Sequence, residues 1–95
     1  MNPKQRDLAR HALGLDGRCR TSYRNHFVTR AGSDDHDIWM AMVAAGWATR
    51  RRGSELTGGA DIFRLTSAGA TAALIGDERL DAEDFPNHPR SFPHD

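Results

Sequence analysis

Histidine and cysteine are the residue types in this chain best suited to catalysis or metal binding, and their spacing favours neither. No two of the five histidines have HxxxH or HExxH spacing, since they stand at positions 11, 26, 36, 88 and 94. Cys19 and His26 do not form a familiar ligand pair, whereas structural zinc requires four ligands at characteristic spacings. Gly58 and Gly59 are not followed by the GK[ST] of a phosphate loop. The sequence therefore predicts a protein that is not an enzyme and has no cofactor, metal or small-molecule substrate.

Arginine is the other residue type that could carry function, because its charge is unevenly distributed along the chain. The net charge is +0, but residues 1–30 and 50–64 are basic while residues 31–49 and 65–95 are acidic. Such blocks indicate either a polarised surface that binds an anion or an acidic tail that lies on a basic face of the same molecule. The candidate contacts for nucleic acid or another partner are Arg6, Arg10, Arg18, Arg20, Arg24, Arg50, Arg51 and Arg52.

The length and composition predict one small domain in the cytoplasm. The chain has 95 residues, which suffices for one domain. No apolar run approaches the about 18 residues that span a bilayer, and charged residues interrupt the N-terminal segment where a signal peptide would be apolar. We therefore expect no membrane association. With a single cysteine, an internal disulfide is excluded.

The first helix is predicted over residues 3–13. Asn2 is a favoured N-cap and Pro3 suits the first helical position, where its missing N–H costs nothing. Leu8 and Ala12 fall on one face of this helix. Gly14 can adopt the left-handed conformation that ends it.

A second helix is predicted over residues 34–45. Ser33 is a favoured N-cap, and the acidic residues that follow suit the positive end of a helix dipole. Gly46 and Trp47 are placed as in a common C-terminal capping motif.

A β-hairpin followed by a helix is predicted in the second half of the chain. The segments ATRRR (48–52) and ADIFRL (60–65) are the two strands, and residues 53–59 form the tip. Thr66 then caps a third helix over residues 67–75.

Alternation along the return strand places Phe63 and Leu65 on one side and Ile62 and Arg64 on the other. An additional short strand is predicted over residues 23–29, where aromatic and β-branched residues are enriched. A short helix in part of this region is the competing prediction.

The last part of the chain differs in composition. Residues 77–95 are acidic and rich in proline, so we assign residues 1–76 to the folded domain and residues 77–95 to a C-terminal tail. The tail is either mobile or extended along the domain, with Phe85 and Phe92 held on its surface.

The segment 42–74, MVAAGWATRRRGSELTGGADIFRLTSAGATAAL, resembles the second half of winged-helix domains, chiefly through AAGW and FRLTSAG. The resemblance implies an α+β fold, a small winged-helix-like domain of three helices with a β-hairpin wing and a short extra strand. The short length and the segment YRNHFVT also resemble small uncharacterised phage and prophage proteins.

The resemblance implies a DNA-binding accessory or regulatory protein that contacts the DNA backbone through its basic wing. The helix at 34–45 would occupy the recognition position. Its first turn, however, contains Asp34, Asp35 and Asp37, which repel phosphate groups. Contact would then fall to the wing and the N-terminal arginines, and would be non-specific and salt-sensitive.

The alternative function is that of a phage accessory protein that engages or inhibits a host protein complex, for example an anti-CRISPR or other anti-defence inhibitor. It accounts for the acidic helix and the acidic tail. Asp34, Asp35 and Trp39 are the candidate protein contacts, since tryptophan is favoured at interface hot spots. The sequence predicts no particular oligomeric state.

Overall fold

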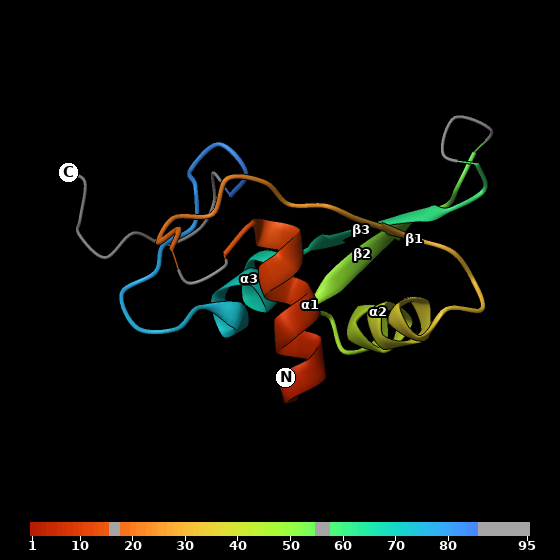
Figure 1. Cartoon of the computed structure of the whole chain (residues 1–95), viewed down its shortest axis with the longest axis horizontal. Coiled ribbons are helices and arrows are strands. Elements are labelled where there is room, and N and C mark those ends of the chain that lie inside the picture. The colour runs from red at the N-terminus through yellow and green to blue at the C-terminus, as the bar shows by residue number, and fades with distance from the viewer. Residues whose placement is uncertain (16–17, 55–57, 86–95) are drawn as a thin grey trace.

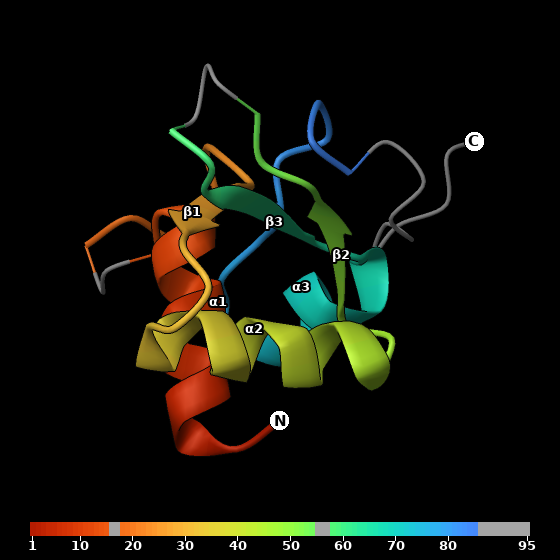
Figure 2. The same cartoon turned by 90° about the vertical axis from the view of Figure 1, so that its right-hand side faces the viewer.

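The computed structural model of this chain describes residues 1–15, 18–54 and 58–85. Within these ranges the fold is α+β, with three helices and one three-stranded antiparallel sheet (Figure 1). The elements in chain order are α1 (Pro3–Leu13), β1 (Phe27–Thr29), α2 (Asp34–Ala44), β2 (Ala48–Arg51), β3 (Asp61–Leu65) and α3 (Ser67–Ala73). Figure 2 shows the helices gathered on one side of the sheet. The sheet therefore has an inner face covered by helices and an outer face that no described helix covers.

Helix α1 has the predicted bounds, because both of its ends are capped. The side chain of Asn2 accepts a hydrogen bond from the backbone of Gln5, and the side chain of Gln5 accepts one from the backbone of Asn2. Gly14 ends the helix in the left-handed conformation, with φ of 79°.

Helix α2 begins where predicted and ends one residue early. Ser33 caps its start by accepting a hydrogen bond from the backbone of His36. At its end, Gly46 N–H donates to the carbonyl of Val43 and Trp47 N–H donates to that of Met42. This pair of bonds is the predicted C-terminal capping motif.

The predicted hairpin is present, and β3 is the central strand in the order β1-β3-β2. Residue 52 lies beyond β2, so this strand is one residue shorter than predicted. Phe63 and Leu65 are buried, whereas Ile62 is half-buried and Arg64 is exposed, as the alternation predicts. Residues 55–57 of the predicted tip lie outside the described residues.

The extra strand is shorter than the predicted 23–29, and only Phe27–Thr29 pair with β3. The preceding backbone has other partners. Ser22 N–H donates to the carbonyl of Arg79, and Tyr23 N–H donates to that of Leu13. The chain therefore follows the end of α1 until residue 26 and joins the sheet only afterwards.

Helix α3 is capped by Thr66 as predicted, but it ends at Ala73 rather than at residue 75. Leu74 is already extended, with ψ of 144°. The N–H of Ile75 donates to the side chain of Glu78, which turns the chain away from the helix. The glycine expected to end the helix, Gly76, is thus two residues beyond its C-cap.

The core lies between the helices and the inner face of the sheet. Its largest fully buried apolar side chains are those of Trp39, Phe63, Leu13 and Met42. Phe85 joins this core with 5% exposure, so the described part of the acidic segment, residues 77–85, packs on the domain. Phe92 lies outside the described residues.

None of the helices in the described ranges is both long enough and apolar enough to cross a membrane.

Candidate nucleic-acid interface

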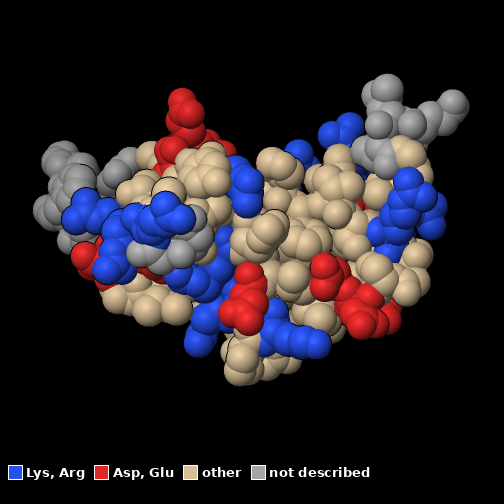
Figure 3. All heavy atoms as spheres, in the orientation of Figure 1, with Lys and Arg blue, Asp and Glu red and all other residues tan. Residues whose placement is uncertain are grey.

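Most of the predicted contact arginines lie towards the two ends of an elongated molecule, and Arg6 and Arg10 lie on α1 between them (Figure 1). The longest dimension is 44 Å, against 26 and 25 Å for the others. The segment after α1 lies at one end of this axis and the hairpin at the other (Figure 1). Figure 3 shows basic side chains gathered at both ends. The structure thus separates Arg18, Arg20 and Arg24, which follow α1, from Arg50, Arg51 and Arg52 of the hairpin (Figure 1).

Towards the first end, on α1, Arg10 is engaged by an acidic side chain. Its guanidinium donates from Nη1 and Nη2 to the two carboxylate oxygens of Glu78, and from Nη1 to the carbonyl of Ala73. The hydrogen bonds from Arg10 and, to a smaller extent, from the N–H of Ile75 lower the pKa of Glu78 against the effect of its burial. Arg10 therefore fixes the segment after α3 to α1 and is withdrawn from external contact.

The other arginines at this end differ in their hydrogen-bond partners and in their exposure. Arg24 donates to the carbonyl of His11 at the end of α1, at 2.8 Å from Nη2. Arg20 lies 3.3 Å from Asp77 in an exposed ion pair. Arg18 is exposed, and Arg6 is half-buried with an Nε that has no hydrogen-bond partner among the described residues. The acidic segment therefore lies beside the basic one, the second of the two charge arrangements considered from sequence.

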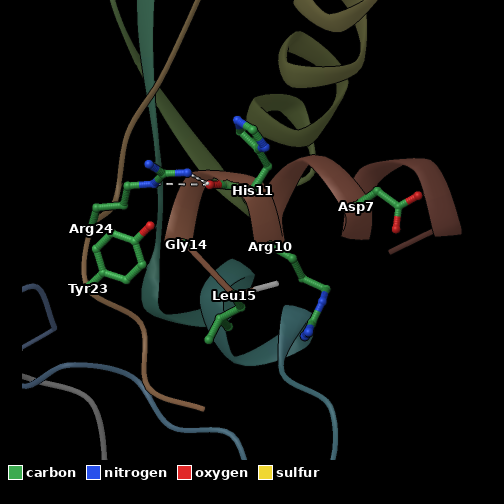
Figure 4. Close-up of a pocket in the computed structure, with 7 residues that line it drawn as sticks. All are labelled: Asp7, Arg10, His11, Gly14, Leu15, Tyr23 and Arg24. Atoms are coloured by element: carbon green, nitrogen blue, oxygen red, sulfur yellow. Dashed lines mark hydrogen bonds between the residues drawn. The ribbon is translucent and has the colours of Figure 1, made fainter. Parts of the chain in front are cut away.

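A cavity of about 550 Å³ opens at this end beside α1 (Figure 4). It is lined by Asp7, Arg10, His11, Gly14, Leu15, Tyr23 and Arg24. Figure 4 shows the guanidinium of Arg24 directed at the carbonyl of His11. The guanidinium of Arg10 points away from both His11 and Arg24 (Figure 4). Both cations in the lining are thus bound by groups of the chain itself, so the cavity does not assemble an anion site from the predicted arginines.

At the hairpin end, Asp61 joins α2 to the two strands of the hairpin. Its Oδ2 lies 2.8 Å from Nε2 of His36 and 2.8 Å from Nε of Arg50, and its Oδ1 accepts from the N–H of Gly53 at 2.9 Å. Because an ionised carboxylate only accepts, Nε2 of His36 carries the proton in this contact. The bonds from His36, Gly53 and Arg50 lower the pKa of Asp61 to about 2. Arg50, a predicted contact, is therefore held mainly as a structural group.

Arg51 and Arg52 are the predicted contacts at this end that are exposed and form no ion pair with a described carboxylate. Two further exposed arginines were not among the predicted contacts: Arg30 packs beside Gly58 near the hairpin tip, and Arg64 lies on β3 near the base of the hairpin, opposite Thr49. None of the four forms a salt bridge with a carboxylate of the described residues. The alternation along β3 already placed Arg64 on the outer face, but no local pattern indicated Arg30.

The predicted protein contacts on α2 are placed differently from one another. Asp34 is exposed and Asp35 half-exposed in the first turn. Trp39 is fully buried, with its ring 5.5 Å from that of Phe63 and 5.4 Å from that of Phe27 between centroids. Trp39 is thus a core residue in this structure and presents no surface to a partner.

Within the described residues, no group of three or more His, Cys, Asp or Glu side chains could hold a metal ion. Comparison with protein-family models, with curated proteins and with solved structures gave no match.

Proposed function

We propose that this chain is a non-enzymatic binding module, an accessory or regulatory protein that contacts the nucleic-acid backbone through its hairpin end. One observation carries the proposal. Arg30, Arg51, Arg52 and Arg64 are exposed on the hairpin or beside it, without a carboxylate partner in the described part of the chain. Away from the hairpin, Arg10 and Arg24 are bound internally. Unpaired arginines attract phosphate groups and release counterions on contact.

The strand order β1-β3-β2, with α2 directly before the hairpin, supports a winged-helix-like arrangement. In that arrangement the hairpin is the wing and α2 occupies the recognition position. The proposed phage or prophage origin rests on the sequence resemblance, and we propose a cytoplasmic location because nucleic acid and host complexes are both present there.

The test is the salt dependence of binding to a short, fluorescently labelled duplex of random sequence. We expect binding at about 50 mM salt that weakens steeply by about 200 mM, with a log–log slope of about −3 for contacts from three to four arginines. Replacing Arg51 and Arg52 together with glutamine is expected to reduce the magnitude of this slope by about 2.

The matched control replaces Arg20 and Arg79, two exposed arginines outside the hairpin, with glutamine. It removes the same charge but should leave the salt slope nearly unchanged. Absence of binding even at low salt would overturn the proposal. Equal effects of the two double variants would show that the hairpin is not the contact.

The second candidate function, binding to a host protein complex, is favoured by exposed apolar and acidic groups. Val28 has 50% exposure on an edge strand, and the first turn of α2 presents Asp34. A partner with a basic and apolar surface fits these groups. Capture from nuclease-treated host lysate that is lost in Val28→Ser and Asp34→Asn variants would support this function, whereas capture abolished by nuclease alone would support nucleic-acid binding.

A further inference from the structure

We propose that a nucleic-acid duplex docks flat on the outer face of the sheet, and that α2 does not enter its groove. This inference rests on the proposed function and specifies its contact surface and substrate class. It departs from the arrangement in which the helix of the recognition position reads the groove.

The strand register defines the residues of the outer face. Arg51 and Val28 are both aligned with Ile62, one from each neighbouring strand. Thr49 is aligned with Arg64, two positions further along the strands on the same face. Because side chains alternate between the two faces of a strand and the inner positions of β3 are buried, these five residues project away from the helices.

Arg30 extends this surface towards the hairpin tip. Its Nη2 lies 2.8 Å from the position that a Cβ on Gly58 would occupy, so the guanidinium packs directly on the backbone that leads into β3. Arg30 follows β1 and Arg52 follows β2, which places one arginine after each edge strand. Arg30 has the same parity as Val28, so Arg30, Arg51 and Arg64 border a small aliphatic centre formed by Val28 and Ile62.

The charges of the two faces favour this docking side. Asp61 projects to the inner side, where His36 and Arg50 bind it. The acidic first turn of α2 lies on the helical side of the sheet (Figure 2). A polyanion is therefore attracted to the outer face and repelled by the start of α2.

The composition of the outer face favours a duplex over a single strand. Proteins that bind single strands use exposed aromatic rings on which bases stack. Among the described residues, Phe27 and Phe63 pack against Trp39 on the inner side of the sheet. Tyr23 is 58% exposed, but it lies beside Gly14 at the end of α1 and not on the outer face of the sheet. The strand residues of the outer face therefore offer arginines for phosphates but no aromatic ring for bases, and a duplex presents phosphates at twice the linear density of one of its strands.

The experiment measures anisotropy of a labelled duplex and of one of its isolated strands at equal concentration and low salt. We expect the duplex to bind at least about fivefold more tightly than the strand. Thr49→Glu places a carboxylate opposite Arg64 and is expected to weaken duplex binding by about tenfold or more, and Arg64→Gln by about three- to tenfold.

Thr71→Glu is the matched control, since it makes the same substitution at an exposed position of α3, on the helical side of the sheet. It should change the Kd for the duplex by less than about twofold. Replacing Asp34 and Asp35 with asparagine should likewise change it by less than about twofold, because α2 lies away from the bound duplex.

The outcomes separate this inference from the proposed function. Equal or tighter binding of the single strand, or a gain of about tenfold from the two asparagine replacements, would overturn the inference while leaving nucleic-acid binding intact. A Thr71→Glu effect as large as that of Thr49→Glu would also overturn it. Absence of binding to both nucleic acids would overturn the proposed function itself.

Discussion

Atom Oε2 of Glu78 lies 2.7 Å from Nη2 of Arg10, which stands 68 positions earlier in the chain. The same carboxylate accepts from Nη1 of Arg10 and from the N–H of Ile75. This contact ties the chain after α3 to α1 and pairs one predicted partner contact with an internal carboxylate. Arg10 therefore has a structural role, although its charge alone predicted a role in binding.

We expect Glu78→Gln to lower the free energy of unfolding by about 1–3 kcal/mol, because Arg10 loses its charge-assisted hydrogen bonds. Urea denaturation followed by far-ultraviolet circular dichroism measures the change. Asp77→Asn is the control, since its pair with Arg20 is exposed and should contribute less than about 1 kcal/mol. Equal losses in the two variants would contradict a structural role specific to Glu78.

Acid should remove the contribution of Asp61 to stability. Its pKa is about 2 in the folded chain against an ordinary value of 3.8, so the unfolded chain binds the proton more readily. The contribution of Asp61 is therefore complete above about pH 4 and is lost as the pH falls towards about 2. Urea midpoints at about pH 7, 4 and 2.5 should show Asp61→Asn less stable than the parent at neutral pH.

The difference in urea midpoint between the Asp61→Asn variant and the parent chain should become smaller as the pH falls. The variant retains Glu78, whose pKa is also lowered, so both chains keep the pH dependence of that residue. A difference that stays constant down to the lowest pH would be inconsistent with the contacts from His36, Gly53 and Arg50.

Gly69→Ala should destabilise the chain although alanine is the better helix former. Alanine in place of glycine inside a helix normally gains about 0.5–1 kcal/mol. Here a Cβ on Gly69 would overlap the carbonyl oxygen of Trp47, a backbone atom that cannot rotate away. We expect a loss of about 1–3 kcal/mol in the free energy of unfolding, measured by urea denaturation.

Ser67→Ala, at the exposed first position of the same helix, should change the free energy of unfolding by less than about 0.5 kcal/mol. If Gly69→Ala were as stable as Ser67→Ala, the close packing of α3 on the α2–β2 connection would be refuted.

Trp39 should contribute to stability and not directly to partner binding. Its side chain has 0% exposure, so Trp39→Ala is expected to cost about 3–5 kcal/mol through the cavity it leaves. Trp39→Phe keeps most of the apolar contact and should remain folded. Anisotropy titration should give the same Kd for the duplex with this variant as with the parent chain. If the variant were folded but did not bind the duplex, Trp39 would have to contribute to the contact surface.

The sequence by itself determined the elements whose signals are local. The caps at Asn2, Ser33 and Thr66 predicted three helix starts correctly, because each cap bonds to a backbone group within three residues. The alternation around Phe63 correctly separated the buried side of β3 from its exposed side, since side-chain direction in a strand follows residue parity.

The tertiary structure alone decided which arginines are free and how far the elements extend. Nothing near Arg10 indicates Glu78 as its partner, and nothing near Thr29 indicates that Phe27–Thr29, unlike residues 23–26, pair with β3. The burial of Trp39 likewise depends on rings contributed by β1 and β3. These contacts join residues that are distant along the chain, so they depend on the packing of several elements at once, which the local pattern of residue types does not specify.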